Sequence, residues 1–111
     1  MDNMSQIVEI DVVELKNKID LNSNIQIIDV REPVELAICK IQDTMHIPMK
    51  EIPAQIDKLN KKDELIILCR SGVRSAQVCE FLINNGFENV KNLKGGILEW
   101  VRLIDPSQPQ Y

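Results

Sequence analysis

Residues 65–75 read LIILCRSGVRS, and this stretch decides the fold class and indicates the chemistry. Its first four residues, Leu65–Leu68, form a short apolar run of the kind found in strands that are buried on both faces. A helical pattern begins at about Ser75 and continues to Asn85. Cys69 to Arg74 then form a tight loop that joins a strand to a helix. The sequence therefore places one thiol at the start of a ring of main-chain N–H groups, beside a helix N-terminus.

Such a loop favours the thiolate form of Cys69. The main-chain N–H groups, the positive end of the helix dipole and the charges of Arg70 and Arg74 all stabilise S⁻. We therefore expect the pKa of Cys69 to lie below the usual value of about 8.5. A thiolate attacks sulfane sulfur well and carries it afterwards. Gly72 lies at the loop apex, where the backbone needs a positive φ or a close approach. An inert, buried cysteine at the end of a strand is the alternative.

Apolar runs and helical patterns alternate along the whole chain. Strands are predicted at Ile7–Ile10, Asn24–Val30, Met45–Ile47, Leu65–Leu68 and Asn89–Asn92, and helices at Asp11–Lys18, Glu32–Ile38, Ile52–Leu59, Ser75–Asn85 and Ile97–Ile104. This alternation predicts an α/β fold with a central, mostly parallel five-stranded sheet and helices on both faces. Residues 1–105 are predicted to form a single domain, and residues 106–111 an extended, loosely held tail. The loops after residues 29 and 68 are expected to meet at the carboxyl edge of the sheet.

Composition restricts the classes of binding partner and the cellular compartment of the protein. The chain has 111 residues and a net charge of −4, which argues against nucleic acid or an anionic membrane as the main partner. Residues 1–11 are acidic and show no signal peptide, and no apolar stretch is long enough to span a membrane. Three cysteines at positions 39, 69 and 79 match no metal-ligand spacing. An odd number of cysteines in a chain without a leader predicts reduced thiols and a cytoplasmic protein without a metal.

The spacing between Cys69 and the loop arginines separates two chemistries. Phosphatases with a cysteine nucleophile use Cys-x5-Arg, in which the arginine forks onto the phosphate oxygens. Here four residues separate Cys69 from Arg74, and Ser75 occupies the Cys-x5-Arg position. A loop one residue shorter makes a smaller cradle, which suits a sulfur atom better than a phosphate group.

Several motifs together resemble the single-domain rhodaneses, the thiosulfate-type sulfurtransferases. They are Asp29-Val30-Arg31-Glu32, the loop Cys69–Ser75, Gly86-Phe87, and Leu93-Lys94-Gly95-Gly96-Ile97 with Trp100, and the similarity covers about Ile7 to Trp100. The resemblance implies a rhodanese-like fold and a six-residue active loop, which belongs to sulfurtransferases and not to the related phosphatases.

The resemblance also implies a mechanism. Cys69 takes a sulfane sulfur from a donor such as thiosulfate, becomes a persulfide, and passes the sulfur to a nucleophilic acceptor in a ping-pong cycle. Cyanide is the acceptor in vitro, and a thiol or a protein in vivo. Main-chain amides from Arg70 to Ser75 hold the outer sulfur, while Arg70 and Arg74 attract thiosulfate. The implied substrate-binding residues are Arg70, Ser71, Gly72, Val73, Arg74 and Ser75. No metal or organic cofactor is implied.

The sequence departs from the family in one segment and resembles a subgroup in another. Where many members have Gly-His and Gly-Ala, this chain has Cys39-Lys40 and Asp43-Thr44. The tail from Ile104 to Tyr111 resembles the end of rhodanese domains on enzymes that activate sulfur-carrier proteins. This second similarity suggests a protein acceptor.

Other residues with reactive side chains have simpler interpretations. Asp29 and Arg31 are expected to position the active loop, with direct substrate contact as the alternative. Cys79 lies on the apolar stripe of its helix and is predicted to be core. Cys39 is a candidate for resolving an oxidised Cys69 as a disulfide. His46 is predicted to be a half-buried structural histidine, and a Cys-His protease pair is the alternative.

Three alternative functions remain open at this level. The first is a protein-to-protein persulfide relay that feeds a sulfur-carrier or thiolation pathway and turns over small donors poorly. The second is a phosphatase or arsenate reductase of the same fold, which Ser75 at the arginine position disfavours. The third is a non-catalytic binding module, whose usual sign would be a missing loop cysteine.

Overall fold

The computed structural model describes residues 7–111. The prediction that the N-terminus holds no signal peptide falls partly on residues 1–6, which lie outside the described residues. Its strands are β1 (Val8–Ile10), β2 (Ile25–Asp29), β3 (Met45–His46), β4 (Glu64–Leu68) and β5 (Val90–Leu93). Its helices are α1 (Val12–Asp20), α2 (Pro33–Leu36), α3 (Ile52–Gln55), α4 (Val73–Asn84) and α5 (Gly96–Leu103), with 3₁₀ turns η2 (Met49–Glu51) and η3 (Ile56–Lys58) on either side of α3.

The strands form one sheet in the order β1-β5-β4-β2-β3, and every pairing is parallel. The central strand β4 pairs Ile66 with Ile27 of β2 and Ile67 with Asn92 of β5. Each parallel pair needs a crossover, and these crossovers place helices over both faces of the sheet. The predicted α/β class and the parallel sheet are therefore confirmed.

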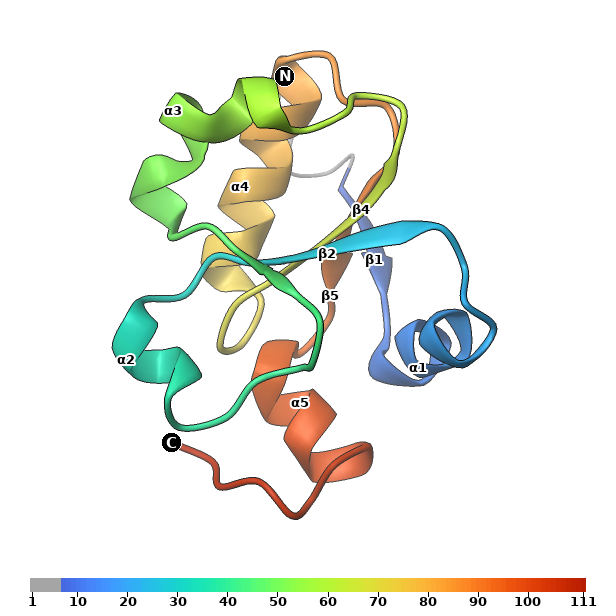
Figure 1. Ribbon diagram of the computed structural model, residues 1–111, viewed down its shortest axis with the longest axis vertical. Coiled ribbons are helices and arrows are strands. Elements are labelled where there is room, and N and C mark those ends of the chain that lie inside the picture. Colours follow the sequence, from blue (N-terminus) through green and yellow to red (C-terminus); the bar gives the residue numbers. More distant parts are fainter. Residues whose placement is uncertain (1–6) are drawn as a thin grey trace.

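Two apolar clusters fill the two faces of the sheet. In Figure 1, α1 and α5 lie on one side of the sheet, and α3 and α4 lie on the other. Ile66 and Leu68 belong to the cluster with α1 and α5, while Leu65, Ile67 and Cys69 belong to the cluster with α4. Alternate residues of a strand point to opposite faces. The alternation through β4 therefore directs the Cys69 side chain toward α4.

Some helix boundaries differ from the sequence prediction. Helix α4 begins at Val73, two residues before the predicted start, because Gly72 adopts a left-handed φ of 106° and serves as its N-cap. The predicted single helix Ile52–Leu59 is instead α3 followed by η3. The helix breaks because Gln55 has φ −109° and ψ 4°, outside the α-helical region.

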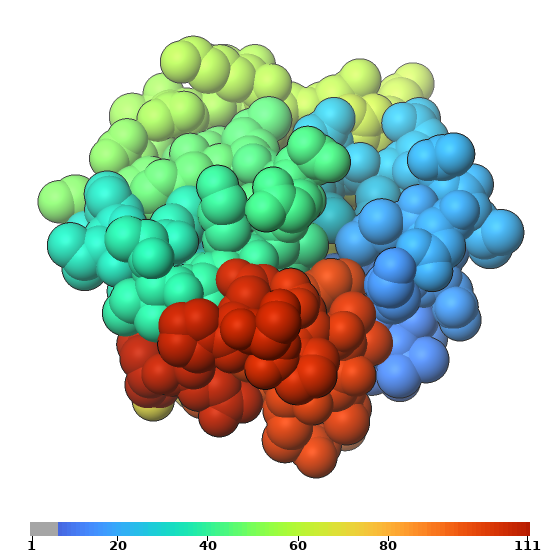
Figure 2. Space-filling view, turned by 60° about the horizontal axis from the view of Figure 1, so that its bottom comes forward, coloured from blue at the N-terminus to red at the C-terminus, as the bar shows by residue number. Residues whose placement is uncertain are grey.

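The C-terminal segment makes hydrogen bonds to a distant part of the chain. The side chain of Gln108 accepts a hydrogen bond from Lys40 N and donates one to Lys40 O, both at 2.8 Å. Figure 2 shows this red segment packed across the face of the molecule beside α5 and the segment that follows α2. These two contacts join residues 68 positions apart, so the local sequence does not reveal them. Within residues 7–111, no helix is long and apolar enough to cross a membrane.

Candidate active site

The candidate site lies at the carboxyl edge of the sheet, where the chain leaves β2 and β4. Val30 N donates to Leu68 O at 3.0 Å, which joins the two strand ends directly. The loops after residues 29 and 68 therefore meet at this edge, as the alternating pattern predicts.

The N-terminus of α5 fixes the orientation of the loop that carries Cys69. Ile97 N donates to Cys69 O at 2.9 Å, and Leu98 N donates to Arg70 O at 3.2 Å. This close approach requires Gly96, since a Cβ there would lie 2.4 Å from Arg70 O. The loop carbonyls are thereby turned toward α5, which leaves the following N–H groups free to face the sulfur.

Donors surround the sulfur of Cys69 on the other side. Gly72 N lies 3.1 Å from Sγ, Ser75 N lies 3.4 Å from it, and Ser75 Oγ lies 3.3 Å from it. Burial raises the pKa of Cys69, but hydrogen bonds from Ser75, Gly72 and Ser71 outweigh burial and lower the pKa. The positive φ of Gly72 and the early start of α4 bring these donors to the sulfur. The lowered pKa agrees with the sequence prediction.

Both loop arginines are already paired. Arg74 forks onto the carboxylate of Glu35 with two hydrogen bonds of 2.8 Å. The hydrogen bonds from Arg74 lower the pKa of Glu35 to about 2, and those to Glu35 raise the pKa of Arg74. Arg70 is exposed, but its Nε donates to Tyr111 O at 2.8 Å and its guanidinium carbon lies 5.0 Å from the centre of the Tyr111 ring.

Asp29 and Arg31 form a buried ion pair beside the loop. Both side chains are 0% exposed, and Arg31 Nη2 lies 2.8 Å from Asp29 Oδ2. Arg31 Nη1 donates to the Tyr111 hydroxyl at 2.9 Å, and that hydroxyl donates to Glu35 at 2.6 Å. Burial lowers the pKa of Arg31, but hydrogen bonds to Asp29 and Tyr111 outweigh burial and raise it. With no exposed surface, the pair is placed to brace the loop.

The remaining predicted site residues differ in exposure. Ser71 and Val73 are exposed, Gly72 is half-buried, and Ser75 is fully buried. Gly72 N and Ser75 N hydrogen-bond the sulfur, and the Ser75 hydroxyl oxygen also lies close to it.

Three residues at the site are not predicted from the sequence alone. Glu35 and Tyr111 connect the loop arginines to the buried ion pair, and Asn92 hydrogen-bonds Ser75 at 2.5 Å. Asn92 carried a usable signal, because an uncharged polar side chain near the end of a buried strand needs a hydrogen-bond partner. Glu35 and Tyr111 carried no local signal.

The other cysteines and the histidine have structural surroundings. Cys79 is 0% exposed, and burial raises its pKa to about 12, as expected of a core thiol. Cys39 lies in the cluster on the α1–α5 face, whereas Cys69 lies in the cluster on the α4 face, so the disulfide hypothesis loses its geometric basis. His46 Nε2 lies 2.6 Å from Arg31 O, which makes it a support for the loop after β2. Among residues 7–111, no group of three or more His, Cys, Asp or Glu is placed to hold a metal.

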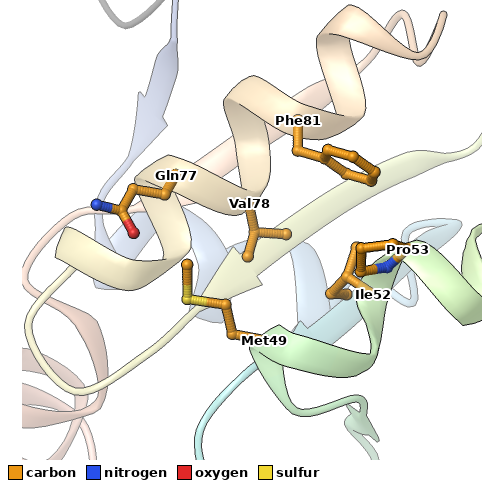
Figure 3. Close-up of a pocket in the computed structure, with 6 residues that line it drawn as sticks. All are labelled: Met49, Ile52, Pro53, Gln77, Val78 and Phe81. Atoms are coloured by element: carbon orange, nitrogen blue, oxygen red, sulfur yellow. The ribbon is translucent and has the colours of Figure 1, made fainter.

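Two neighbouring hollows lie on the α4 side of the sheet. Figure 3 shows the first, between η2–α3 and α4, which is lined by Met49, Ile52, Pro53, Gln77, Val78 and Phe81. The second has a volume of about 420 Å³ and is lined by Val30, Glu32, Met49, Lys50, Pro53 and Arg74. Both hollows share Met49 and Pro53, and the second one reaches the active loop at Arg74.

Comparison with known proteins identifies the family of the chain. The family model described as the rhodanese-like domain matches residues 11–103, and the chain belongs to this family. A Bacillus subtilis protein, the candidate sulfurtransferase YtwF, is 41% identical over 95 residues, which cover 86% of this chain and 91% of that protein. A protein of Allochromatium vinosum named sulfurtransferase is 37% identical and covers 85% of this chain and 88% of its own.

Two further comparisons bear on fold and partners. The crystal structure of a rhodanese-like domain protein from Staphylococcus aureus superposes with a TM-score of 0.82 at 36% identity, covering 95% of this chain and 99% of that one. A B. subtilis protein, the candidate sulfur carrier YrkF, is 35% identical over 89% of this chain and 54% of its own length.

Proposed function

We propose that this protein is a sulfurtransferase in which Cys69 carries the transferred sulfur as a persulfide. The observation that carries the proposal is the pair of main-chain donors close to Sγ, Gly72 N and Ser75 N. These donors stabilise a thiolate before transfer, and they suit the terminal S⁻ of a persulfide after it. Relatives named as sulfurtransferases that match most of the chain support the same reaction.

The proposed cycle has two displacement steps. In the first, the Cys69 thiolate attacks the outer sulfur of a donor such as thiosulfate. An S–S bond forms, the donor's S–S bond breaks, and sulfite leaves with the bonding electron pair. In the second, a nucleophilic acceptor attacks the terminal sulfur of the persulfide, and Cys69 leaves as thiolate. Cyanide gives thiocyanate, whereas an acceptor thiolate becomes a new persulfide, so both steps balance without an added oxidant.

A protein-to-protein relay is the second candidate, and the paired arginines favour it. Arg70 and Arg74 are the residues expected to attract a small dianion, but Tyr111 and Glu35 already engage them. A donor that brings its sulfur on a cysteine persulfide has less need of these charges. The hollow beside Arg74 has apolar side chains in its lining that such a partner could contact. The similarity to the candidate sulfur carrier YrkF also supports a protein partner.

The test measures thiocyanate formation from thiosulfate and cyanide, with Cys69→Ala as the inactive control and Cys79→Ala as a matched control at a core thiol. Turnover that needs Cys69 supports the sulfurtransferase. A lack of turnover with one added sulfur on Cys69, seen by intact mass after incubation with a cysteine desulfurase and cysteine, supports the relay. Absence of both turnover and added sulfur refutes the proposal. A phosphatase would instead hydrolyse a chromogenic phosphate ester in a Cys69-dependent way.

A further inference from the structure

Asn92 of β5 lies directly behind the active loop, with only 2% of its surface exposed. Its Nδ2 donates to Gly72 O at 3.1 Å and to the Glu9 carboxylate at 3.3 Å. A carbonyl and a carboxylate only accept hydrogen bonds, so the nitrogen end of the amide must face them. The oxygen end, Oδ1, therefore faces Ser75.

The orientation of this amide decides where the Ser75 hydroxyl proton points. Ser75 Oγ lies 2.5 Å from Asn92 Oδ1 and 3.3 Å from Cys69 Sγ. A hydroxyl has one proton and two lone pairs, so it cannot donate fully to both neighbours. The shorter contact takes the proton, and a lone pair of Oγ is left facing the sulfur. In that arrangement Ser75 accepts a hydrogen bond from the thiol form of Cys69.

We propose that Asn92 is a positioning residue that controls the active thiol through Ser75. With Cys69 as a thiol, the Ser75 proton is held by Asn92. When Cys69 releases its proton to solvent, the Ser75 hydroxyl has two unfavourable choices. It can keep a lone pair facing the negative sulfur, or it can turn its proton toward the sulfur and leave Asn92 Oδ1 without that hydrogen bond. Asn92 therefore opposes thiolate formation, while the main-chain N–H groups of the loop favour it. The functional meaning of this inference rests on the proposed function, in which Cys69 is the nucleophile.

This opposition suits the proposed reaction. The nucleophilicity of a thiolate falls as its pKa falls, with a Brønsted slope of about 0.4–0.5. A loop that lowered the pKa of Cys69 much further would produce a stable thiolate that is a poor nucleophile. By competing for one donor, Asn92 keeps the sulfur more basic than the loop alone would make it.

Other titratable groups near the sulfur lie on α4 and β1. Arg74 and Cys79, both on α4, interact electrostatically with Cys69. Glu9 on β1 contacts Asn92, and it is exposed to solvent. Gly72 O also accepts from Ala76 N at 3.1 Å, so replacing Asn92 does not leave this carbonyl unpaired.

Removing the competing acceptor is expected to lower the pKa of Cys69. In Asn92→Leu, a side chain of similar size that cannot hydrogen-bond, the Ser75 hydroxyl is free to donate to S⁻. A hydrogen bond to a charged group is equivalent to roughly one pKa unit. Ser75→Ala alone should shift the pKa little, because the native hydroxyl is committed to Asn92. In the Asn92→Leu background, the same Ser75→Ala change should raise the pKa by roughly one unit.

The measurement is the ultraviolet absorbance of the Cys69 thiolate against pH, with the matching Cys69→Ser protein subtracted. It is made on the native chain, the two single variants and the double variant. A larger effect of Ser75→Ala in the Asn92→Leu background supports the proposal. Equal effects in both backgrounds overturn it, since Ser75 would then be a simple donor to sulfur. If Asn92→Leu does not fold, Asn92→Val replaces it. A rise of a full unit in the pKa of Cys69 in Ser75→Ala alone also overturns the proposal.

Alkylation of Cys69 adds a kinetic readout that a purely structural role would not move. With a pKa lower by one unit, the limiting rate constant at high pH should fall about threefold, while the rate at low pH should rise about threefold. These titrations need no sulfur donor. They therefore remain valid if no persulfide forms, a result that would refute the proposed function alone.

Discussion

Replacing Glu35 with glutamine should remove an ion pair that stabilises the active loop only while Glu35 is ionised. Glu35 accepts a forked pair of hydrogen bonds from Arg74 and one from the Tyr111 hydroxyl. Its side chain is 14% exposed, and that of Arg74 is 34% exposed. Glu35→Gln keeps the shape of the side chain and a hydrogen-bonding oxygen, and it removes the charge.

The magnitude follows from the pKa of Glu35, which hydrogen bonds from Arg74, together with those from Tyr111 and the Glu32 main chain, lower from 4.5 to about 2. At about 1.4 kcal/mol per unit, this shift corresponds to roughly 3.5 kcal/mol of stability. Arg74 is partly exposed, so water screens the pair, and we expect a loss of about 1–2 kcal/mol. Because the folded pKa is lowered, the contribution is fully present above pH 4.5. It is lost as the pH falls toward about 2.

Urea unfolding of the native chain and Glu35→Gln, at neutral pH and at about pH 2, tests this reasoning. The free energies of unfolding should differ at neutral pH and converge in acid. Glu88→Gln, a change at an exposed glutamate, is the matched control and should have little effect at either pH. An equal deficit at both pH values, or no deficit at neutral pH, would refute the electrostatic reasoning.

Three further predictions concern the groups around the loop. Gly96→Ala should cost at least about 2 kcal/mol of the free energy of unfolding in urea, since φ is 62° and a Cβ would meet main-chain oxygen. Gly86→Ala is the control and should cost about 1 kcal/mol, because φ is 90° but the Cβ would meet a flexible lysine side chain. Tyr111→Phe should cost about 1 kcal/mol and make the C-terminal segment more sensitive to proteolysis; unchanged cleavage contradicts this. Asp29→Asn should cost about 3–5 kcal/mol by leaving Arg31 buried without its counter-charge; a loss below about 1 kcal/mol in calorimetry contradicts this.

The local features of the active loop could be predicted from sequence because their causes are local. The apolar run through Leu68 defines a buried strand, and Gly72 supplies the left-handed residue that starts the next helix. The donors of the loop lie within six residues of Cys69, so no distant partner had to be known. The sequence pattern places the start of α4 two residues too late, because a helical pattern shows the apolar face of a helix and not its cap.

The sequence by itself determined the parallel α/β arrangement and the position of one thiol among main-chain donors, since hydrophobic periodicity and loop spacing operate over short separations. Only the tertiary structure decided the partners of that loop. Glu35 and Tyr111 meet Arg74 and Arg70 across 39 and 41 residues, and Asn92 reaches Ser75 across 17. Which polar groups meet at such separations depends on how the strands order in the sheet and where their ends converge. These contacts therefore exist only after the chain has folded.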